Sequence, residues 1–268
     1  MTGVRVTFIG TGGASSRRYG HTNALVEAGG MRLMIDFGFL TPSRLERYGH
    51  SLGQITHVAV SHIHADHVGG LEELAFSSRF LHQRKPTLLL PRGLGRELWE
   101  QSLRGGLERV SDNRGNALRC TLDSYFDCVD LGVEWCDLGP MSIRPFRTDH
   151  VPDKKSWGFV VRDGASGSKM IFGCDTRARQ PELLEDPPSE DFAAGPIFHD
   201  CLLSDHGLAS IHIHLRKIIY DPTVQERIVL VHYGDDLEDH LPAIRKAGLK
   251  VTFPGEVIRL ADWRSCVH

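Results

Sequence analysis

The sequence predicts an α/β protein built as a four-layer αββα sandwich, in which two sheets pack face to face between outer helices. Two observations indicate this fold. Strand-like segments dominate the first half of the 268-residue chain, and the last third repeats strand then helix. Such an order is typical of layered folds, where helices cover the apolar faces of sheets. Hydrophobic residues make up 41% of the chain, which allows one domain across residues 1–268.

The first half is expected to form short strands separated by glycine-containing turns. VRVTFIG is an apolar run that ends in the turn TGGASS, and HTNALVEAGGMRLMIDFG contains two strand patterns joined at Gly29-Gly30. A polar stretch without periodicity, 105–130, is expected to be irregular. The expected strands lie at 4–10, within 21–38, at 56–62 and at 86–91, and the expected helices at 69–81 and 94–107.

The second half returns to strand patterns and then alternates strands with helices. The Pro-rich stretch 181–196 is interpreted as a loop inside one domain, because candidate metal ligands lie on both sides of it. The expected strands lie at 133–138, 141–150, 156–163, 168–175, 196–203, 227–234, 249–253 and 257–260, and the expected helices near 214–220 and at 236–246.

Composition excludes several classes of protein. The formal net charge of −3 excludes a generally basic nucleic-acid surface, although not a local basic groove. The start MTGVRVTFIGTGG lacks a signal-peptide cleavage region, and no run of about 18 apolar residues occurs. A cytoplasmic location is therefore expected. The six cysteines have no zinc-knuckle or thioredoxin-type spacing and are interpreted as free, mostly buried thiols.

SHIHADHVGG, residues 61–70, is the strongest candidate for a functional motif. His62 and His64 alternate with one residue between them, so both imidazoles point the same way in extended backbone. Asp66 and His67 follow a turn and can face a second point nearby. Zinc binds imidazole and carboxylate groups, so one loop can offer two half-sites that need further ligands. Three candidates stand at the ends of predicted strands: His150, Asp175 and His232.

Together these motifs resemble the metallo-β-lactamase fold. The resemblance is carried by SHIHADHVGG with TDH, FGCDTR and VHYGD. It extends to the ribonuclease Z-like branch through FIGTGGASS, HTNALVEAGG and MIDFG, and covers the chain from residue 4 to about 240. The chain is most similar to the arm-less phosphodiesterases that open cyclic nucleotides, a group that includes the phage anti-Pycsar enzymes.

The resemblance implies two Zn²⁺ ions, or Mn²⁺ since both accept nitrogen and oxygen ligands. Two such ions side by side can activate a hydroxide and stabilise a phosphoryl oxygen. The implied ligands are His62, His64 and His150 for one ion, Asp66, His67 and His232 for the other, and Asp175 bridging both.

The resemblance also implies a histidine that protonates the leaving oxygen. His199, followed by Asp200, stands where relatives carry a histidine and an acidic residue. A further histidine is expected about a dozen residues later, where IHIHL offers His212 and His214. His212 is favoured, but the choice between the two stays open. Asp66, His199 and His212 are the expected catalytic residues.

Three further positions border this site. Asp36 in MIDFG is expected to accept a hydrogen bond that orients a ligand histidine. Cys174 stands where relatives commonly have glycine, which leaves its backbone geometry open. GTGGASS lacks the lysine and the following helix of a phosphate-binding loop, and is interpreted as a turn at the rim of the site.

The predicted reaction is hydrolysis of a 3′,5′-cyclic nucleotide to the linear monophosphate. Bacterial-type ribonuclease Z enzymes carry a tRNA-binding arm between the single histidine and the bridging aspartate, but His150 and Asp175 are only 25 positions apart. Lys154 and Lys155 are too few for an extended phosphate track, so tRNA binding is not expected. Two alternatives stay open: a ribonuclease Z-like tRNA 3′-endonuclease, and a C–N or C–S bond hydrolase.

A homodimer is implied by the resemblance, and the polar, histidine-bearing segment 204–216 could reach a partner. A binding module on an inactive scaffold would lack a ligand. None of the seven is missing.

Overall fold

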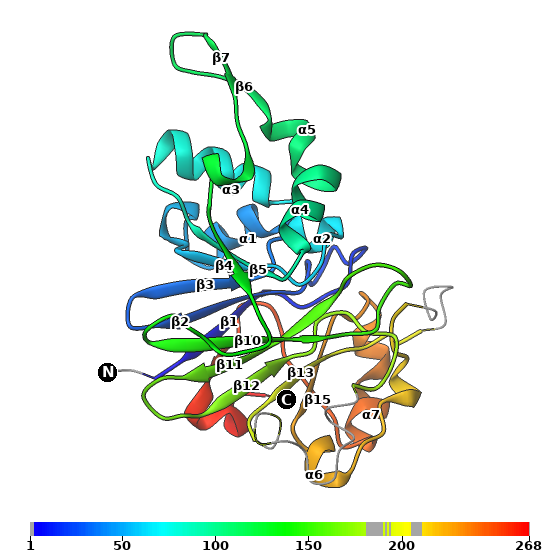
Figure 1. Cartoon of the computed structure of the whole chain (residues 1–268). Helices are drawn as coiled ribbons and strands as arrows, with labels where there is room; N and C mark the ends of the chain where they lie inside the picture. The colour runs from blue at the N-terminus through cyan, green and yellow to red at the C-terminus, as the bar shows by residue number, and fades with distance from the viewer. Residues whose placement is uncertain (1–2, 181–189, 191, 193, 205–210, 268) are drawn as a thin grey trace.

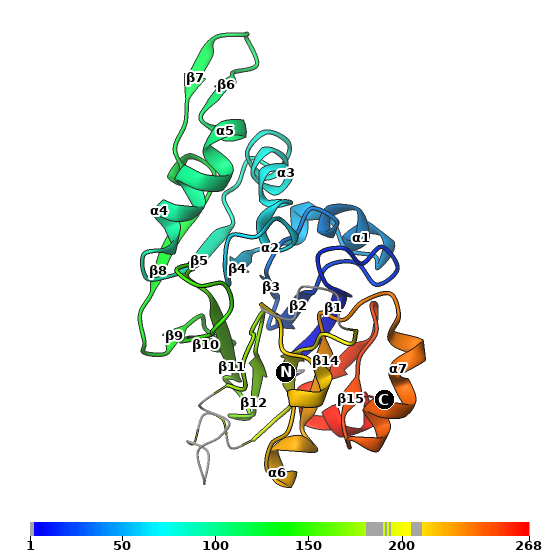
Figure 2. The ribbon, with the colours of Figure 1, turned by 90° about the vertical axis from the view of Figure 1, so that its right-hand side faces the viewer.

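The computed structural model describes residues 3–180, 190, 192, 194–204 and 211–267. Two seven-stranded sheets stack face to face, and helices lie on the outer side of each sheet (Figures 1 and 2). This arrangement confirms the predicted αββα sandwich. None of the helices in the described ranges is both long and apolar enough to cross a bilayer.

The first sheet joins antiparallel and parallel strands. β1, β2 and β3 form an antiparallel meander, and the predicted turn at Gly29-Gly30 connects β2 to β3 with positive φ at both glycines. β3, β4, β5 and β8 then run parallel. In sheet order, the strands are β16 (Val257–Arg259), β1 (Arg5–Gly10), β2 (Asn23–Ala28), β3 (Met31–Ile35), β4 (His57–Ala59), β5 (Thr87–Pro91) and β8 (Asp127–Leu131).

In the second sheet, five strands run in the same direction and end at the same end of the sheet. β12, β13, β14 and β15 are parallel, and β10 runs in the same direction because β11 is antiparallel to both β10 and β12. The residues that follow β10, β12 and β14 are therefore close in space. In sheet order, the strands are β15 (Lys250–Val251), β14 (Ile228–Val231), β13 (Ile197–Asp200), β12 (Lys169–Phe172), β11 (Trp157–Asp163), β10 (Met141–Arg147) and β9 (Cys136–Asp137).

Helices are present at three of the four predicted places, 69–81, 94–107 and 236–246, but not near 214–220. The structure also contains short helices at 41–47, 65–68 and 222–225 that were not predicted. The expected helix 94–107 is α4 and α5 joined by a π-helical turn, and 69–81 contains α3 followed by another such turn. Near 214–220 there is only a short 3₁₀ turn, Leu215–Lys217. The helices are α1 (Thr41–Arg47), α2 (Ala65–Val68), α3 (Leu71–Phe76), α4 (Leu94–Leu98), α5 (Arg104–Leu107), α6 (Pro222–Gln225) and α7 (Leu237–Lys246).

Apolar side chains fill the space between the sheets and pack closely beneath the ends of the strands. Phe8 on β1 and Phe198 on β13 meet edge to face with ring centroids 4.8 Å apart, and Phe172 on β12 packs against both rings. All three side chains are buried. Close packing of this kind resists shifts of the backbone, so it holds the residues that follow these strands in place.

The prediction that 105–130 is irregular is wrong. The hairpin of β6 (Arg109–Ser111) and β7 (Ala117–Arg119) projects beyond α5, and β8 follows as the edge strand of the first sheet (Figures 1 and 2). β8 is exposed at four of its five positions, so it lacks the apolar alternation that marks a half-buried strand. Its pairing with β5 supplies the order that the sequence pattern does not show.

Candidate metal centre

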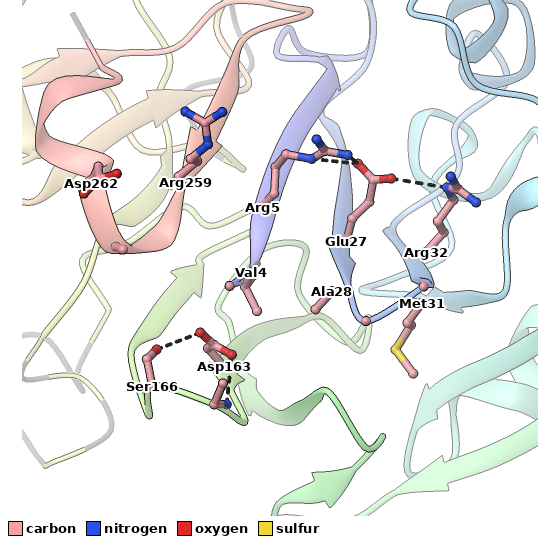
Figure 3. Close-up of a pocket in the computed structure, with 15 residues that line it drawn as sticks. Val4, Arg5, Glu27, Ala28, Met31, Arg32, Asp163, Ser166, Arg259 and Asp262 are labelled. Carbon is pink, nitrogen blue, oxygen red and sulfur yellow. Dashed lines mark hydrogen bonds and ion pairs between the residues drawn. The ribbon is translucent and has the colours of Figure 1, made fainter. Parts of the chain in front are cut away.

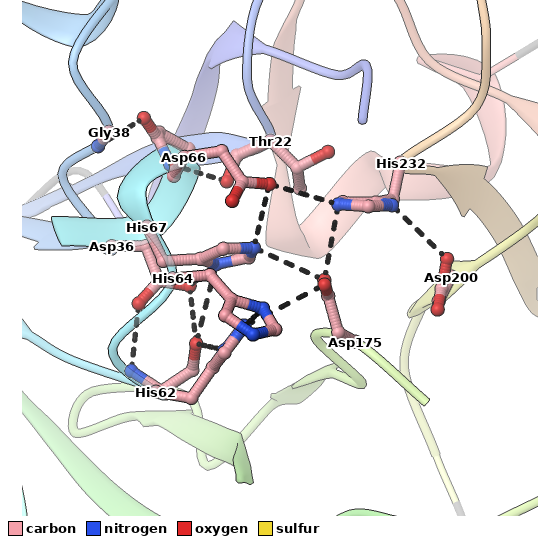
Figure 4. A network of polar contacts seen from close by, with 12 residues as sticks. Thr22, Asp36, Gly38, His62, His64, Asp66, His67, Asp175, Asp200 and His232 are labelled. Carbon is pink, nitrogen blue, oxygen red and sulfur yellow. Dashed lines mark hydrogen bonds and ion pairs between the residues drawn. The ribbon is translucent and has the colours of Figure 1, made fainter. Parts of the chain in front are cut away.

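The seven predicted metal ligands meet at one end of the sandwich, where strands of both sheets end. Figure 4 labels all of them except His150. His62 lies three residues beyond β4, and α2 begins shortly afterwards and carries Asp66 and His67. His150, Asp175 and His232 follow β10, β12 and β14 of the second sheet. Each half of the chain thus contributes ligands that the other half lacks.

The first group of potential ligands contains His62, His64, His150 and Asp175, with one ligand atom of each within 4.8 Å of the others. His64 Nδ1 lies 2.9 Å from His62 Nε2 and 3.2 Å from His150 Nε2. Asp175 Oδ2 lies 3.8 Å from His62 Nε2 and 3.6 Å from His150 Nε2. Three imidazole nitrogens and one carboxylate oxygen therefore surround one point.

The second group contains Asp66, His67, His232 and the other oxygen of Asp175. Asp66 Oδ2 lies 3.3 Å from His67 Nε2 and 3.4 Å from His232 Nε2. Asp175 Oδ1 lies 3.3 Å and 3.4 Å from the same two nitrogens. The two oxygens of Asp175 thus face different groups, which is the placement expected of a bridging carboxylate.

A second layer of contacts orients these imidazoles. Asp36 Oδ2 accepts a hydrogen bond from His67 Nδ1 at 2.7 Å, and the backbone N–H and hydroxyl of Ser61 donate to the same carboxylate. His150 Nδ1 donates to the carbonyl oxygen of Ile211 at 2.7 Å. Both contacts leave Nε2 free to bind a metal ion, and Asp36 has the orienting position that the sequence predicted.

Three non-glycine residues at this centre have left-handed backbone conformations: Asp36 (φ 60°), Cys174 (φ 48°) and His232 (φ 63°). Side chains at positive φ are uncommon, and such strain is typical of functional sites where the surrounding structure fixes the backbone. The value at Cys174 explains why glycine suits this position. Its conformation turns the chain after β12 and places Asp175 between the two groups.

Burial and charge set the protonation of the first group. Burial and the neighbouring His67 hold the pKa of His62 well below its ordinary value, and burial lowers the pKa of His64 to about 4. Burial also lowers the pKa of His150. The three imidazoles are therefore neutral near pH 7, which is the form that binds metal ions.

The second group attracts positive charge. Burial opposes ionisation of Asp66 and Asp175, but His67 and His232 outweigh it and hold the pKa of both carboxyls well below the usual range. For His67 and His232, burial alone would lower the pKa. The carboxylates around these two imidazoles reverse that effect and raise their pKa well above 6.5.

These residues fit divalent metal ions. Asp175 Oδ1 is a buried carboxylate oxygen without a hydrogen bond from the described residues, and such an atom is costly unless a cation compensates it. Imidazole nitrogens with carboxylate oxygens are ligands that zinc and manganese both accept.

A third cluster borders the second group and contains Asp200, His212 and His232. Asp200 Oδ2 lies 2.9 Å from His212 Nδ1, and Asp200 Oδ1 lies 3.4 Å from His232 Nδ1. The sequence suggested Asp200 only as the neighbour of His199. Asp200 is the last residue of β13, and β13 pairs with β14, the strand that leads to His232.

His199 faces away from the metal centre. Its ring is fully buried, with Nε2 2.9 Å from the Tyr220 hydroxyl and Nδ1 2.7 Å from the Asp200 carbonyl oxygen. Adjacent side chains on a strand point to opposite faces, so β13 directs Asp200 toward the ligands and His199 away from them. The expectation that His199 protonates the leaving oxygen does not fit this geometry.

His212 and His214 also differ in their surroundings. His212 stacks on His232 with ring centroids 4.7 Å apart and reaches Asp200. His214 instead accepts a hydrogen bond from the backbone N–H of Arg216 and caps the 3₁₀ turn. The structure thus brings His212, and not His214, to the metal centre.

The turn GTGGASS lies at the rim of this centre, as the sequence suggested. Its Gly13 donates its N–H to the Tyr233 carbonyl, and a Cβ at Gly13 would lie 3.2 Å from His232 Cε1. Glycine therefore allows this turn to approach the His232 ring closely.

The chain matches, over residues 4–252, the family model described as "Anti-Pycsar protein Apyc1". It belongs to this family. Among relatives that carry the same description, that of Paenibacillus sp. (strain J14) is 37% identical over 238 residues, which cover 88% of this chain and 91% of the relative. That of Bacillus phage 010DV004 is 33% identical over 256 residues, covering 92% and 94%. The chain is a metal-dependent hydrolase of this family.

Solved structures show the same fold in more distant proteins. The metallo-β-lactamase fold protein YhfI from Bacillus subtilis superposes with a TM-score of 0.73 at 17% identity, covering 96% of this chain and 99% of that chain. The short form of human tRNase Z gives a TM-score of 0.66 at 20% identity, with the same coverage. Unliganded yeast PDE1 gives 0.69 at 14% identity, again with 96% and 99% coverage. These similarities confirm that this chain, a member of the Apyc1 family, has the metallo-β-lactamase fold.

A cavity of about 670 Å³ lies at the other end of the strands in this Apyc1 family member (Figure 3). Glu27 accepts hydrogen bonds there from Arg5 and Arg32, at 2.8 Å and 3.2 Å. None of the potential metal-ligand groups found in the described residues lines this cavity. The pairing of Arg5, Glu27 and Arg32 across neighbouring strands explains these three charged side chains.

Proposed function

We propose that this chain hydrolyses 3′,5′-cyclic nucleotides to linear nucleoside monophosphates, with two Zn²⁺ or Mn²⁺ ions as cofactors. The observation that carries the proposal is the position of Asp175, whose two oxygens face two separate groups of ligands. Membership of the Apyc1 family supports a phosphodiester substrate, because the chain resembles the arm-less phosphodiesterases that open cyclic nucleotides.

The first ion would be held by His62, His64, His150 and Asp175 Oδ2, and the second by Asp66, His67, His232 and Asp175 Oδ1. When bound, such a pair of ions supplies a nucleophile at neutral pH and stabilises charge on the phosphoryl oxygens. Because ligands from both sheets are needed, we propose that residues 1–268 act as a single catalytic domain.

His212 is the proposed proton donor to the leaving ribose oxygen. Asp200 accepts a hydrogen bond from His212 Nδ1, which fixes the ring and leaves Nε2 to hold the transferable proton. Asp200 is itself fixed by the backbone N–H of Thr176 at 2.9 Å. The role that the sequence suggested for His199 thus passes to His212.

The short segment between His150 and Asp175 supports the proposal that the substrate is small. β11 and β12 with their connecting turn occupy most of it, and no projecting arm emerges there. The hairpin β6–β7 does project, but it is inserted between β5 and β8 of the first sheet.

One observation favours the alternative of RNA cleavage. An open pocket of about 540 Å³ lies next to Ile213, the residue after His212. Four basic residues line it: Arg177, Arg179, Arg216 and Lys217. Basic side chains grouped in this way bind phosphate groups of larger nucleic acids. Arg177, however, already pairs with Asp149 at 2.8 Å.

A panel assay with purified protein separates these functions. The substrates are 3′,5′-cyclic nucleotides, bis-p-nitrophenyl phosphate, precursor tRNA and a β-lactam. Our proposal requires turnover of cyclic nucleotides and about two metal ions per chain by elemental analysis. Efficient cleavage of precursor tRNA with inert cyclic nucleotides would establish the alternative, and turnover of the β-lactam alone would indicate C–N bond hydrolysis.

We also propose a homodimer, by resemblance to the ribonuclease Z-like branch. Of the segment 204–216 on which this expectation rests, residues 205–210 lie outside the described residues. Light scattering at the concentration of the assay tests it, and a fully active monomer would contradict it.

A further inference from the structure

Phe39 is an exposed aromatic side chain beside the metal centre. Six large apolar side chains are exposed in the described part of the chain, and Phe39, at 44% exposure, is the only aromatic one among them. It follows β3 by four residues, and the residue before it, Gly38, packs against the backbone of Asp66. An exposed ring this close to a metal ligand needs an explanation.

Phe39 lies next to Gly69, the residue that directly follows α2. A Cβ at Gly69 would lie 3.1 Å from Phe39 Cβ, so the two residues are in contact. Gly69 donates its N–H to the Ala65 carbonyl oxygen at 2.8 Å, so the two residues are adjacent, and both are exposed. Ala65 stands between the ligands His64 and Asp66. The two small residues therefore lie between the potential metal ligands and Phe39.

The Phe39 ring packs against the ring of His21. The His21 ring is buried and meets Phe39 edge to face, with centroids 4.1 Å apart and an angle of 70° between the rings. An aromatic ring in such a contact has less rotational freedom than a free surface side chain. It is therefore already ordered before a ligand arrives.

We propose that Phe39 stacks against the base of the nucleotide while the phosphodiester lies on the metal centre. The inference rests on the proposed function, because a cyclic nucleotide carries its base on the same ribose as the scissile phosphate. Ala65 and Gly69 project little or no side chain, so they leave room for the ribose between the ligands and the ring. An aromatic face can stack against any of the bases, so Phe39 would bind cyclic nucleotides with little preference for one base over another.

The test compares Phe39→Leu, which keeps an apolar side chain but removes the aromatic face, with Phe39→Trp, which restores one. Steady-state kinetics are measured with cyclic AMP, cyclic CMP and an abasic probe, methyl ribofuranoside 3′,5′-cyclic phosphate. Val257→Ala is the control, since Val257 is also 44% exposed but lies on β16.

In Phe39→Leu, KM for the two nucleotides should rise about tenfold, as expected from the loss of one stacked base. kcat, metal content and KM for the abasic probe should stay within twofold of the wild type. Phe39→Trp should restore KM, and Val257→Ala should change nothing.

Three outcomes would overturn the inference while the proposed function stands: unchanged KM for both nucleotides in Phe39→Leu, an equal rise for the abasic probe, or a change in oligomeric state that accounts for the rise. A wild-type protein that turns over neither nucleotide would overturn the proposed function and this inference together.

Discussion

Asp200 Oδ2 lies 2.9 Å from His212 Nδ1, and both side chains are buried beside the metal ligands. A carboxylate that fixes an imidazole in this way sets which ring nitrogen carries the transferable proton. The pair is separated by eleven residues in sequence. It comes together because Ile213 accepts the Leu202 N–H and donates its own N–H to the Thr176 carbonyl oxygen, both at 2.8 Å.

His212→Ala should lower kcat for cyclic nucleotides by about 10²–10⁴-fold, because the leaving ribose oxygen would depart without a proton. The loss should be much smaller for bis-p-nitrophenyl phosphate, whose leaving group is stable as an anion. Metal content, measured by elemental analysis, should be retained. His214→Ala serves as the matched control. Equal losses on both substrates would contradict a role as proton donor.

His199→Ala should affect stability far more than chemistry. The change removes the ring nitrogen that lies 2.9 Å from the Tyr220 hydroxyl, while the hydroxyl still accepts the Gln180 N–H at 3.0 Å. It also empties a fully buried side-chain site, and the loss of a buried hydrogen bond alone costs about 1–3 kcal/mol. Urea denaturation should therefore show a lower free energy of unfolding, with kcat within a few fold of the wild type. Tyr220→Phe, which removes the partner instead, should weaken the fold similarly. A collapse of kcat in a folded, metal-loaded His199→Ala protein would return the proton-donor role to His199.

Asp175→Ala should remove the bridge between the two ligand groups and cause loss of metal together with nearly all activity. Elemental analysis after gel filtration measures the bound ions. Asp163→Asn is the control, because Asp163 is also a buried aspartate but accepts its hydrogen bonds in the β11–β12 turn, at 3.0 Å from the Ala165 N–H and 2.7 Å from the Ser166 hydroxyl. Full metal occupancy and rate in Asp175→Ala would disprove the bridging assignment.

Cys174→Gly should be tolerated, whereas Cys174→Val should not. At φ 48° a side chain costs about 1–3 kcal/mol, and glycine relieves this strain while losing the packing of the thiol. The free energy of unfolding of Cys174→Gly should therefore stay within about 1 kcal/mol of the wild type. A β-branched valine increases the strain and should destabilise the protein. Equal stability of the two variants would show that the backbone relaxes at this position.

Acid should destabilise the fold partly through His21. Burial lowers its pKa to about 4 in the folded state, compared with 6.5 when unfolded. Between these values the unfolded chain binds a proton that the folded chain does not, so stability is complete above pH 6.5 and decreases as the pH falls toward 4. Urea denaturation of the metal-free protein at several pH values gives the free energy of unfolding as a function of pH. Between pH 6.5 and 4 this free energy should decrease less steeply in His21→Phe than in the wild type. An identical slope would mean that His21 does not contribute.

The layered fold and the residues of the candidate metal centre could be predicted from the sequence, because both predictions depend on local patterns. The spacing in SHIHADHVGG, and the placement of His150, Asp175 and His232 after apolar strands, need only strand periodicity and the chemistry of the side chains. The backbone geometry at Cys174 was left open by the sequence, and the structure shows that Cys174 has the left-handed conformation, with φ 48°.

Only the tertiary structure decided which neighbours of these ligands face the centre. Sequence placed His199 and Asp200 side by side, but the packing of β13 in the sheet turned Asp200 toward His212 and His199 toward Tyr220. The choice between His212 and His214, like the existence of β8, depended on contacts between segments far apart in the chain. Such contacts leave no periodic trace in the sequence, because the side chains involved are selected by their partners and not by their own strand or turn.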